Sequence, residues 1–198
     1  MLMHKMDKLI FATNNPDKIK EIRIVLGDLF NIITLKEAGI DVDIPEPHDT
    51  LEANATEKSR TIHHLTKKNC FSEDTGLETE ALNGEPGVKS ARYAGEHRSF
   101  DENIDKLLTK LDGAENRKAR FRTVISLILN ETEFQFEGIC DGKIIKEKKG
   151  HNGFGYDPIF IPDGSEKTFA EMDIEEKNKF SHRKKAMKKM IDFISANY

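Results

Sequence analysis

Three clusters of polar residues lie far apart in this sequence, and each suits a different part of a nucleotide. Residues 153–158 place two glycines around an aromatic residue, followed by a second aromatic, a carboxylate and a proline. Such a loop suits a pocket in which a flat ring stacks and its edge is read by hydrogen bonds. Residues 13–18 and 73–76 add an ammonium group, hydroxyls and carboxylates. Together the clusters indicate a site for a nucleotide, its phosphates and a metal ion.

The first cluster predicts a turn from a short buried strand into a helix. Residues 9–13 form the apolar strand, Asn15 is a good N-cap, and Pro16 suits the first helical position. We expect free backbone N–H groups at this helix N-terminus, where anions bind, with the Lys18 ammonium folding back over them. The alternative is an ordinary N-cap followed by a surface lysine. The chain contains no Walker sequence, so a triphosphate would be held without a glycine-rich loop.

The second cluster contains an adjacent acid pair, Glu73 and Asp74, at what we expect to be the end of a strand. Neighbouring strand residues point to opposite faces, so one carboxylate of the pair would face a given cleft. A single carboxylate can bind Mg²⁺ or accept a proton from water, and Mg²⁺ on phosphates needs one or two protein carboxylates. Glu46, in a proline-flanked loop, is a possible second ligand. A solvated acidic turn is the alternative.

Lys58 shares a helix face with Asn54, four residues earlier, and could reach the phosphates. An ordinary surface lysine is the alternative.

In the third cluster, Phe154 and Tyr156 suit a strand core as well as a base site, but the glycines around Phe154 would weaken a plain strand. Asp157 could read a base edge or cap the turn.

His182 and Arg183 follow Ser181, which we expect to cap the last helix. Arginine offers a fork of donors, and donors recognise a carbonyl such as O6 of a purine. A solvated basic face is the alternative for this run, and the lysines at positions 185, 188 and 189 fit it.

The elements that must position these residues alternate between strands and helices. Residues 31–35 predict a second strand, and helices are expected over about 49–68 and from Ser99 to Gly113. Residues 120–129 and 133–140 predict a β-hairpin, with a further turn at Asp141 and Gly142. Strands mixed with helices indicate an α/β domain whose loops carry the polar clusters.

Length and composition limit the possible classes of protein. The 198 residues fit one domain, or one domain with two lobes, and 33% of them are charged. A net charge of −4 argues against a general nucleic-acid binder. Cys70 and Cys140 lack metal-ligand spacing, which favours reduced cysteines in a cytosolic protein. The apolar run at 9–12 is too short for a signal peptide, and no segment has membrane-spanning length.

Taken in order, these motifs make the chain similar to the inosine triphosphate pyrophosphatase family. The resemblance covers nearly the whole chain, through segments 11–21, 73–77, 84–95, 153–158, 168–172, 176–178 and 181–183. It implies one domain over residues 1–198, with an elongated mixed β-sheet flanked by helices and two lobes around a central substrate cleft. It also implies a cytoplasmic homodimer. The implied activity is Mg²⁺-dependent hydrolysis of noncanonical purine nucleoside triphosphates (ITP, dITP and XTP) to the monophosphate and pyrophosphate, which removes them from the nucleotide pool.

The resemblance also implies roles for individual residues. Asp74 would be the proton acceptor and a metal ligand, with Glu46 helping to hold the metal. Residues 13–18 would bind the phosphates with Lys58 and Lys177 assisting, residues 154–157 would hold the base, and His182 and Arg183 would read its oxo edge. The implied substrate-binding residues are Thr13, Asn14, Asn15, Pro16, Asp17, Lys18, Lys58, Thr75, Phe154, Gly155, Tyr156, Asp157, Lys177, His182 and Arg183.

The chain departs from the family pattern at two positions. Asn14 stands where many members carry Gly, and Glu73 stands where many bacterial members carry Asp, which leaves the division of roles between Glu73 and Asp74 open. Two other functions stay open: a Maf-like nucleotide pyrophosphatase with another base preference, and a nucleotide sensor without turnover. The sequence identifies no residue that would reject GTP.

Overall fold

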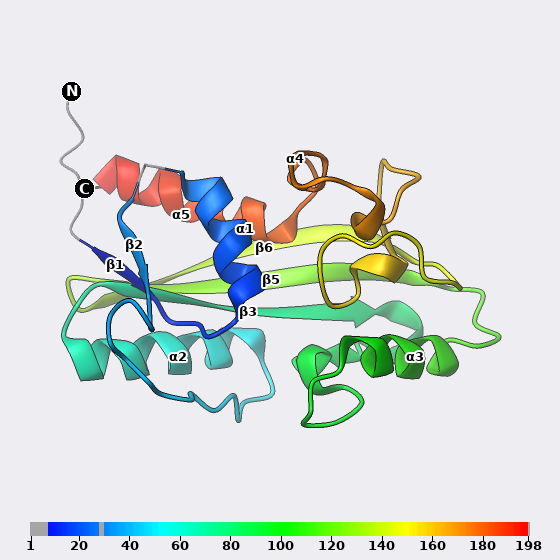
Figure 1. The fold of residues 1–198 in the computed structure, drawn as a ribbon, viewed down its shortest axis with the longest axis horizontal. Helices are drawn as coiled ribbons and strands as arrows, with labels where there is room; N and C mark the ends of the chain where they lie inside the picture. Colours follow the sequence, from blue (N-terminus) through cyan, green and yellow to red (C-terminus); the bar gives the residue numbers. More distant parts are fainter. Residues whose placement is uncertain (1–7, 28–29, 198) are drawn as a thin grey trace. The chain divides into compact units, whose positions relative to one another are not determined.

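The structure, a computed structural model, describes residues 8–27 and 30–197, and Figure 1 shows its mixed β-sheet with helices on the faces. The described strands form one seven-stranded sheet in the order β2-β1-β3-β5-β6-β7, with β4 paired to β3. β1 runs parallel to β2 and to β3, whereas the β3–β4 and β6–β7 pairs are antiparallel. The strands are β1 Leu9–Phe11, β2 Ile32–Thr34, β3 Cys70–Thr79, β4 Pro86–Gly87, β5 Lys118–Leu129, β6 Thr132–Ile144 and β7 Phe160–Pro162. The main helices are α1 Pro16–Leu26, α2 Leu51–Thr66, α3 Phe100–Lys110, α4 Ile174–Lys177 and α5 His182–Asn197.

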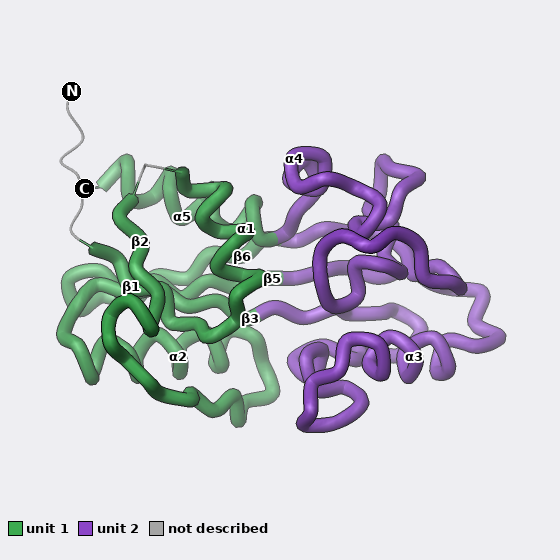
Figure 2. Tube along the Cα trace, in the orientation of Figure 1, with its two compact units in different colours: residues 1–74, 123–138, 183–198 green, residues 75–122, 139–182 purple. Residues whose placement is uncertain are grey.

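The chain divides into two compact units, which Figure 2 shows in separate colours. Unit 1 comprises the chain through Asp74, residues 123–138 and residues from Arg183 onward; unit 2 comprises residues 75–122 and 139–182. The long strands β3, β5 and β6 each contribute residues to both units. Both units therefore consist of segments that are distant in the sequence.

The core of unit 1 has two parts, one on each face of β1. Leu9 and Phe11 belong to one apolar cluster, together with Ile22 of α1 and Met187 of α5. Ile10, between them, belongs to the other cluster, which includes Ile62 of α2. Because side chains alternate along a strand, β1 buries both of its faces, as Figure 1 shows for the helices on either side.

Unit 2 has its own apolar cluster. Leu107 of α3 packs there with Phe121 of β5, Phe160 of β7 and Phe169. The Phe121 and Phe160 rings meet edge to face, with centroids 4.7 Å apart. This aromatic core supports the loop that contains residues 153–158.

Several local predictions are confirmed. The Asn15 side chain caps α1 with Pro16 in its first turn, and Ser99 caps α3. The expected helix over 49–68 is α2, which begins after its cap Thr50. The predicted hairpin corresponds to β5 and β6, which are adjacent in the sheet.

Two predicted chain breaks are wrong. Residues 73–76 do not end a strand, because β3 (Cys70–Thr79) runs through them without interruption. Asp141 and Gly142 form no turn, because β6 runs on to Ile144 and pairs there with β7. A Cβ atom on Gly142 would lie 2.2 Å from the Ile161 carbonyl oxygen, so the glycine permits close strand pairing rather than a turn.

Within the described part of the chain, every helix is too short or too polar to cross a membrane.

Candidate active site

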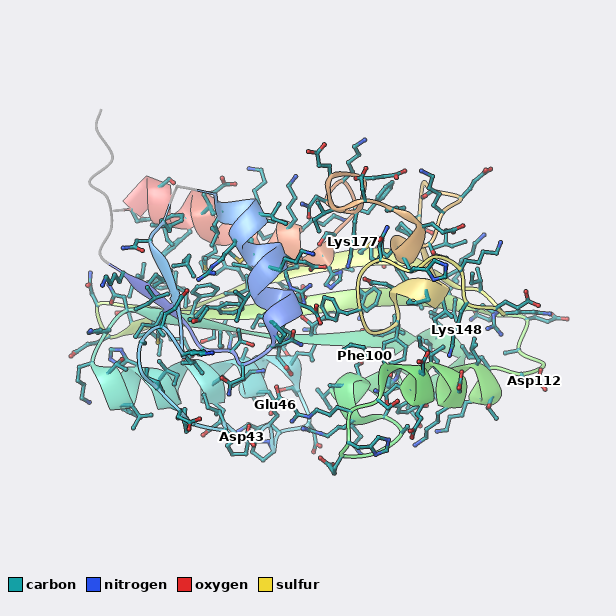
Figure 3. All side chains as sticks on the ribbon, in the orientation of Figure 1. Asp43, Glu46, Phe100, Asp112, Lys148 and Lys177 are labelled. Atoms are coloured by element: carbon teal, nitrogen blue, oxygen red, sulfur yellow. The ribbon has the colours of Figure 1, made fainter. Side chains whose placement is uncertain are left out.

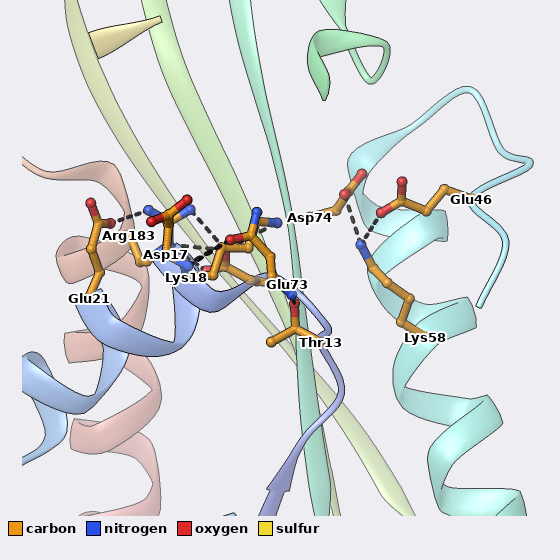
Figure 4. A network of polar contacts seen from close by, with 10 residues as sticks. Thr13, Asp17, Lys18, Glu21, Glu46, Lys58, Glu73, Asp74 and Arg183 are labelled. Carbon is orange, nitrogen blue, oxygen red and sulfur yellow. Dashed lines mark hydrogen bonds and ion pairs between the residues drawn. The ribbon is translucent and has the colours of Figure 1, made fainter. Parts of the chain in front are cut away.

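Glu73 and Asp74 lie side by side in the middle of β3 and have different partners, as Figure 4 shows. Asp74 accepts a hydrogen bond from Lys58. Glu73 accepts hydrogen bonds from Arg183 and forms an ion pair with Lys18. The prediction that the two carboxylates face opposite ways is confirmed, and it divides the site in unit 1 into two groups.

The first group is one ammonium between two carboxylates. Lys58 Nζ lies 2.5 Å from Glu46 Oε1 and 2.9 Å from Asp74 Oδ1. Lys58 is buried on α2, and Glu46 lies on the loop before this helix (Figure 3). Asn54 holds that loop, because its side chain accepts from the His48 N–H and donates to the His48 carbonyl. The helix thus positions both Lys58 and Glu46.

This charge arrangement affects the three groups differently. Burial raises the pKa of Asp74, although the Lys58 ammonium opposes that rise. Burial also disfavours the charge on Glu46, but Lys58 holds the pKa of the Glu46 carboxyl at about 2. Burial disfavours the charge on Lys58 too. The attraction of Asp74 and Glu46 for the ammonium outweighs this effect of burial, so the pKa of Lys58 is raised. One ammonium cannot fully compensate two carboxylates, and the more buried Asp74 is the better proton acceptor.

The same residues fit a magnesium ion in the number and type of their ligands. The Glu46 and Asp74 carboxylates converge on one point, since each has an oxygen within 2.9 Å of Lys58 Nζ. Carboxylate oxygens are ligands that Mg²⁺ prefers, and one or two of them suffice when phosphates share the ion. Among the described residues, no group of three or more His, Cys, Asp or Glu side chains is arranged to hold a metal ion.

The second group is a buried chain of four charges. Arg183 donates from Nε and Nη2 to Glu73, at 2.8–3.0 Å, and from Nη1 to Glu21 of α1. Lys18 Nζ lies 3.3 Å from Glu73 Oε1. Burial disfavours the charge of Glu73, but Arg183 and Lys18 hold the pKa of its carboxyl at about 2. Burial opposes the charge of Arg183 as well, and Glu73 and Glu21 raise its pKa.

The N-terminus of α1 differs from the prediction of free N–H groups. The Asn15 carboxamide oxygen accepts from the backbone N–H of Asp17, at 2.9 Å, and of Lys18, at 3.1 Å. Thr13 Oγ1 accepts from the Asn15 N–H, and the Asn14 side chain donates to the Val42 carbonyl. The cap itself therefore uses the two amides that we expected a phosphate to bind.

In unit 2, the glycine-rich loop forms a compact turn around Asp157. Asp157 Oδ2 accepts from the Phe154 N–H at 3.0 Å and from Lys177 Nζ at 2.6 Å. The Lys177 ammonium lies 5.3 Å from the centre of the Phe154 ring, within cation–π range. Gly153 has φ +74°, and a Cβ there would meet the Asp157 carboxylate. Asp157 thus caps the turn, which was one of its two predicted roles.

Three predicted residues have surroundings that change how they could act. Tyr156 lies in the core of unit 2 and donates to the Ser90 carbonyl, so only its backbone could meet a base. Lys177 pairs with Asp157 beside Phe154, so its predicted contact with the phosphates requires it to leave this ion pair. The buried His182 ring stacks on Phe121, with centroids 4.7 Å apart.

The remaining predicted residues have simpler placements. Thr75 is half-buried on β3, directly after Asp74, and Gly155 has φ +61° with open space where a Cβ would stand. Sequence reasoning missed Glu21. The sequence offered no local signal for it, because its partner Arg183 lies 162 residues further along the chain.

Fold and site together define an α/β protein with a buried carboxylate–ammonium cluster. The Ham1 family profile matches residues 9–193, and the chain belongs to this family.

Among similar proteins, one named dITP/XTP pyrophosphatase from Flavobacterium psychrophilum is 50% identical over 186 residues, covering 94% of this chain and 98% of the relative. A protein of the same name from Porphyromonas gingivalis is 50% identical over 190 residues, with 96% and 98% coverage. The solved structure of the Staphylococcus aureus Ham1 protein has a TM-score of 0.88 at 39% identity, covering 97% of this chain and all of that one (100%).

Proposed function

We propose that this protein is a nucleoside triphosphate pyrophosphatase that hydrolyses ITP, dITP and XTP to the monophosphate and pyrophosphate. The observation that carries the proposal is the buried Asp74 carboxylate, which shares the Lys58 ammonium with Glu46. Membership of the Ham1 family and relatives named dITP/XTP pyrophosphatase support it.

Asp74 is the proposed general base. It accepts a proton from the water that attacks the α-phosphorus, and the bond from that phosphorus to the bridging oxygen of the β-phosphate breaks. Burial favours this role, because it raises the pKa of Asp74 and thus its affinity for the proton. General-base catalysis of this kind contributes roughly 10²–10⁴-fold in rate.

Lys18 and Lys58 are the proposed partners of the phosphates. Lys58 is buried between two carboxylates, and Lys18 is largely buried beside Glu73. Ammonium groups fixed in this way stabilise the charge that develops on the departing pyrophosphate. Phosphate oxygens arriving here compete with Glu46 and Glu73 for these ammonium groups.

We propose Mg²⁺ as the metal, held by Glu46 and Asp74 together with substrate phosphates. When bound, the ion supplies charge neutralisation and fixes the phosphate geometry. A calorimetric titration of Mg²⁺ into protein with the α,β-methylene analogue of ITP tests this without turnover. Glu46→Gln is expected to weaken Mg²⁺ binding, and unchanged binding would contradict the assignment.

The base-binding part of the proposal concerns unit 2. Phe154 offers a ring for stacking, and Lys177 beside it offers donors. A donor directed at a purine 6-oxo group is left unsatisfied by the 6-amino group of adenine, which disfavours ATP. His182 and Arg183 stay predicted readers of the oxo edge. For Arg183, this role requires the exchange of a bond that it makes to Glu73 or Glu21.

The test is pyrophosphate release with Mg²⁺ from ITP, XTP, GTP, ATP and dTTP in parallel. Release mainly from ITP and XTP is expected. Release mainly from dTTP would favour the Maf-like alternative, and tight ITP binding without release would favour a sensor.

We further propose a cytoplasmic homodimer. Sedimentation at micromolar concentration tests the dimer, and fractionation of cells tests the location.

A further inference from the structure

One aromatic side chain outside the predicted site residues lies against the glycine-rich loop of unit 2. The Phe100 ring centroid is 6.2 Å from that of Phe154, and the two ring planes are tilted by 43°. Phe100 is 41% exposed, and among the exposed large apolar side chains in the described part of the chain it is the aromatic one. The exposed Phe100 ring therefore offers a second aromatic face next to Phe154, at which a flat ligand could stack.

Local contacts fix the position of Phe100. It is the first residue of α3, and the Ser99 side chain caps this helix by accepting from the Glu102 N–H. Lys148 lies 2.9 Å from both Asp101 and Asp105, which ties the first turns of α3 to the segment that precedes the glycine-rich loop (Figure 3). The backbone under Phe100 is therefore held, whereas its exposed ring can still turn.

We propose that Phe100 forms the second wall of the purine-binding site and stacks on the base opposite Phe154. A flat base between two rings needs a centroid separation of roughly 7 Å, about twice the 3.4 Å spacing of stacked bases. The present 6.2 Å and 43° tilt fall short of this, and a turn of the exposed Phe100 ring supplies the difference. Phe100 is then a base-binding residue, and this inference depends on the proposed function.

A second wall changes substrate binding more than chemistry. Stacking of a base on an aromatic side chain is sequence-tolerant, because every base has a π-face. Phe100→Ala is therefore expected to raise the KM for ITP about fivefold, at the low end for one stacked base, with kcat near the wild-type value. Phe100→Tyr keeps the ring and is expected to restore the wild-type KM.

The absence of tryptophan from the sequence gives a test that needs no turnover. Phe100→Trp introduces a single tryptophan at the proposed wall, and Leu65→Trp is the matched control at an exposed position of α2 that is 62% exposed. The tryptophan emission is recorded on titration with the α,β-methylene analogue of ITP and, separately, with inorganic tripolyphosphate, which lacks a base. We expect quenching at position 100 by the analogue alone, and none at position 65.

Several outcomes would overturn the inference. These are equal responses to the analogue and to tripolyphosphate, no response at position 100, or a Phe100→Ala variant whose KM is unchanged. A Phe100→Ala variant that alters only the association state would assign the ring to a protein contact instead. If the wild-type protein releases pyrophosphate from ITP while position 100 stays silent, this inference fails and the proposed function stands. If the wild-type protein releases none, the proposed function fails first.

Discussion

At the scale of single residues, the site depends on how charges are shared. Glu73 and Asp74 are neighbours, yet Glu73 is compensated by Arg183 and Lys18, whereas Asp74 shares Lys58 with Glu46. The first carboxyl is held ionised, and the second has a raised pKa. Of these two acids, Asp74 alone combines burial with incomplete compensation, which favours it over Glu73 as the proton acceptor.

Asp74→Asn tests the role of the base. We expect a loss of pyrophosphate release from ITP by roughly 10²–10⁴-fold. The fold should persist, because Lys58 keeps Glu46 as its partner. The measurements are kcat for the variant, which reports activity, and circular dichroism, which reports whether the fold persists. Asp141→Asn, at an exposed position, serves as the control. Turnover near the wild-type rate in Asp74→Asn would remove Asp74 from the mechanism.

Glu73→Gln tests the buried ion pair through the pH dependence of stability. The folded-state pKa of Glu73, about 2, lies below its value in an unfolded chain. Its stabilising contribution is therefore present above about pH 4.5 and is lost as the pH falls from there toward about 2. At pH 7 we expect the variant to unfold more easily by about 3–5 kcal/mol, because Arg183 loses a charged partner. By pH 3 the difference from wild type should shrink.

Urea unfolding at pH 7, 5, 4 and 3 measures this difference. Glu96→Gln, at an exposed position, is the control and should follow the wild-type curve at every pH. A wild-type-to-Glu73→Gln difference that stays constant from pH 7 to pH 3 would contradict the ion-pair assignment.

At the scale of elements, the sequence predicted what local chemistry decides. The Asn15 and Ser99 caps and the hairpin of β5 with β6 depend on short-range signals, and all three are present. The prediction from sequence failed where a strand contains polar residues or glycine, because it placed a strand end or a turn there. β3 passes through residues 73–76, and β6 passes through Gly142, because partners far along the chain hold them there. Such tertiary pairing overrides the local preference for a turn.

Gly142→Ala tests the reinterpretation of that glycine. In β6 an added Cβ would lie 2.2 Å from the Ile161 carbonyl oxygen and 2.9 Å from the Pro162 Cα atom, so the β6–β7 pairing must shift. We expect a loss of roughly 1–3 kcal/mol in the free energy of unfolding. The control is Gly95→Ala, where the added Cβ would meet only the side chain of His97. Equal unfolding midpoints for the two variants would indicate that the strand has room at Gly142.

At the scale of the whole molecule, the site was only partly predictable, because its key contacts join distant segments. Arg183 and Glu73 are 110 residues apart, and nothing local to either residue indicates that pairing. The sequence supplied the residue types and the order of the motifs. It could not show that the Arg183 donors are used by Glu73 and Glu21, or that the Tyr156 ring lies in a core. Those facts depend on which side chains the completed fold brings together.

The division of the chain between the units leads to the last prediction. Each unit has its own apolar core, but three long strands, β3, β5 and β6, contribute residues to both. Unfolding of one core would disrupt the strands that also form part of the other core. We therefore expect the chain to unfold in a single cooperative transition. Tryptophans introduced singly by Leu65→Trp in unit 1 and Phe100→Trp in unit 2 are reporters for urea unfolding. Coincident midpoints and slopes are expected. A transition at position 100 clearly separated from that at position 65 would show that each core holds its part of the strands independently.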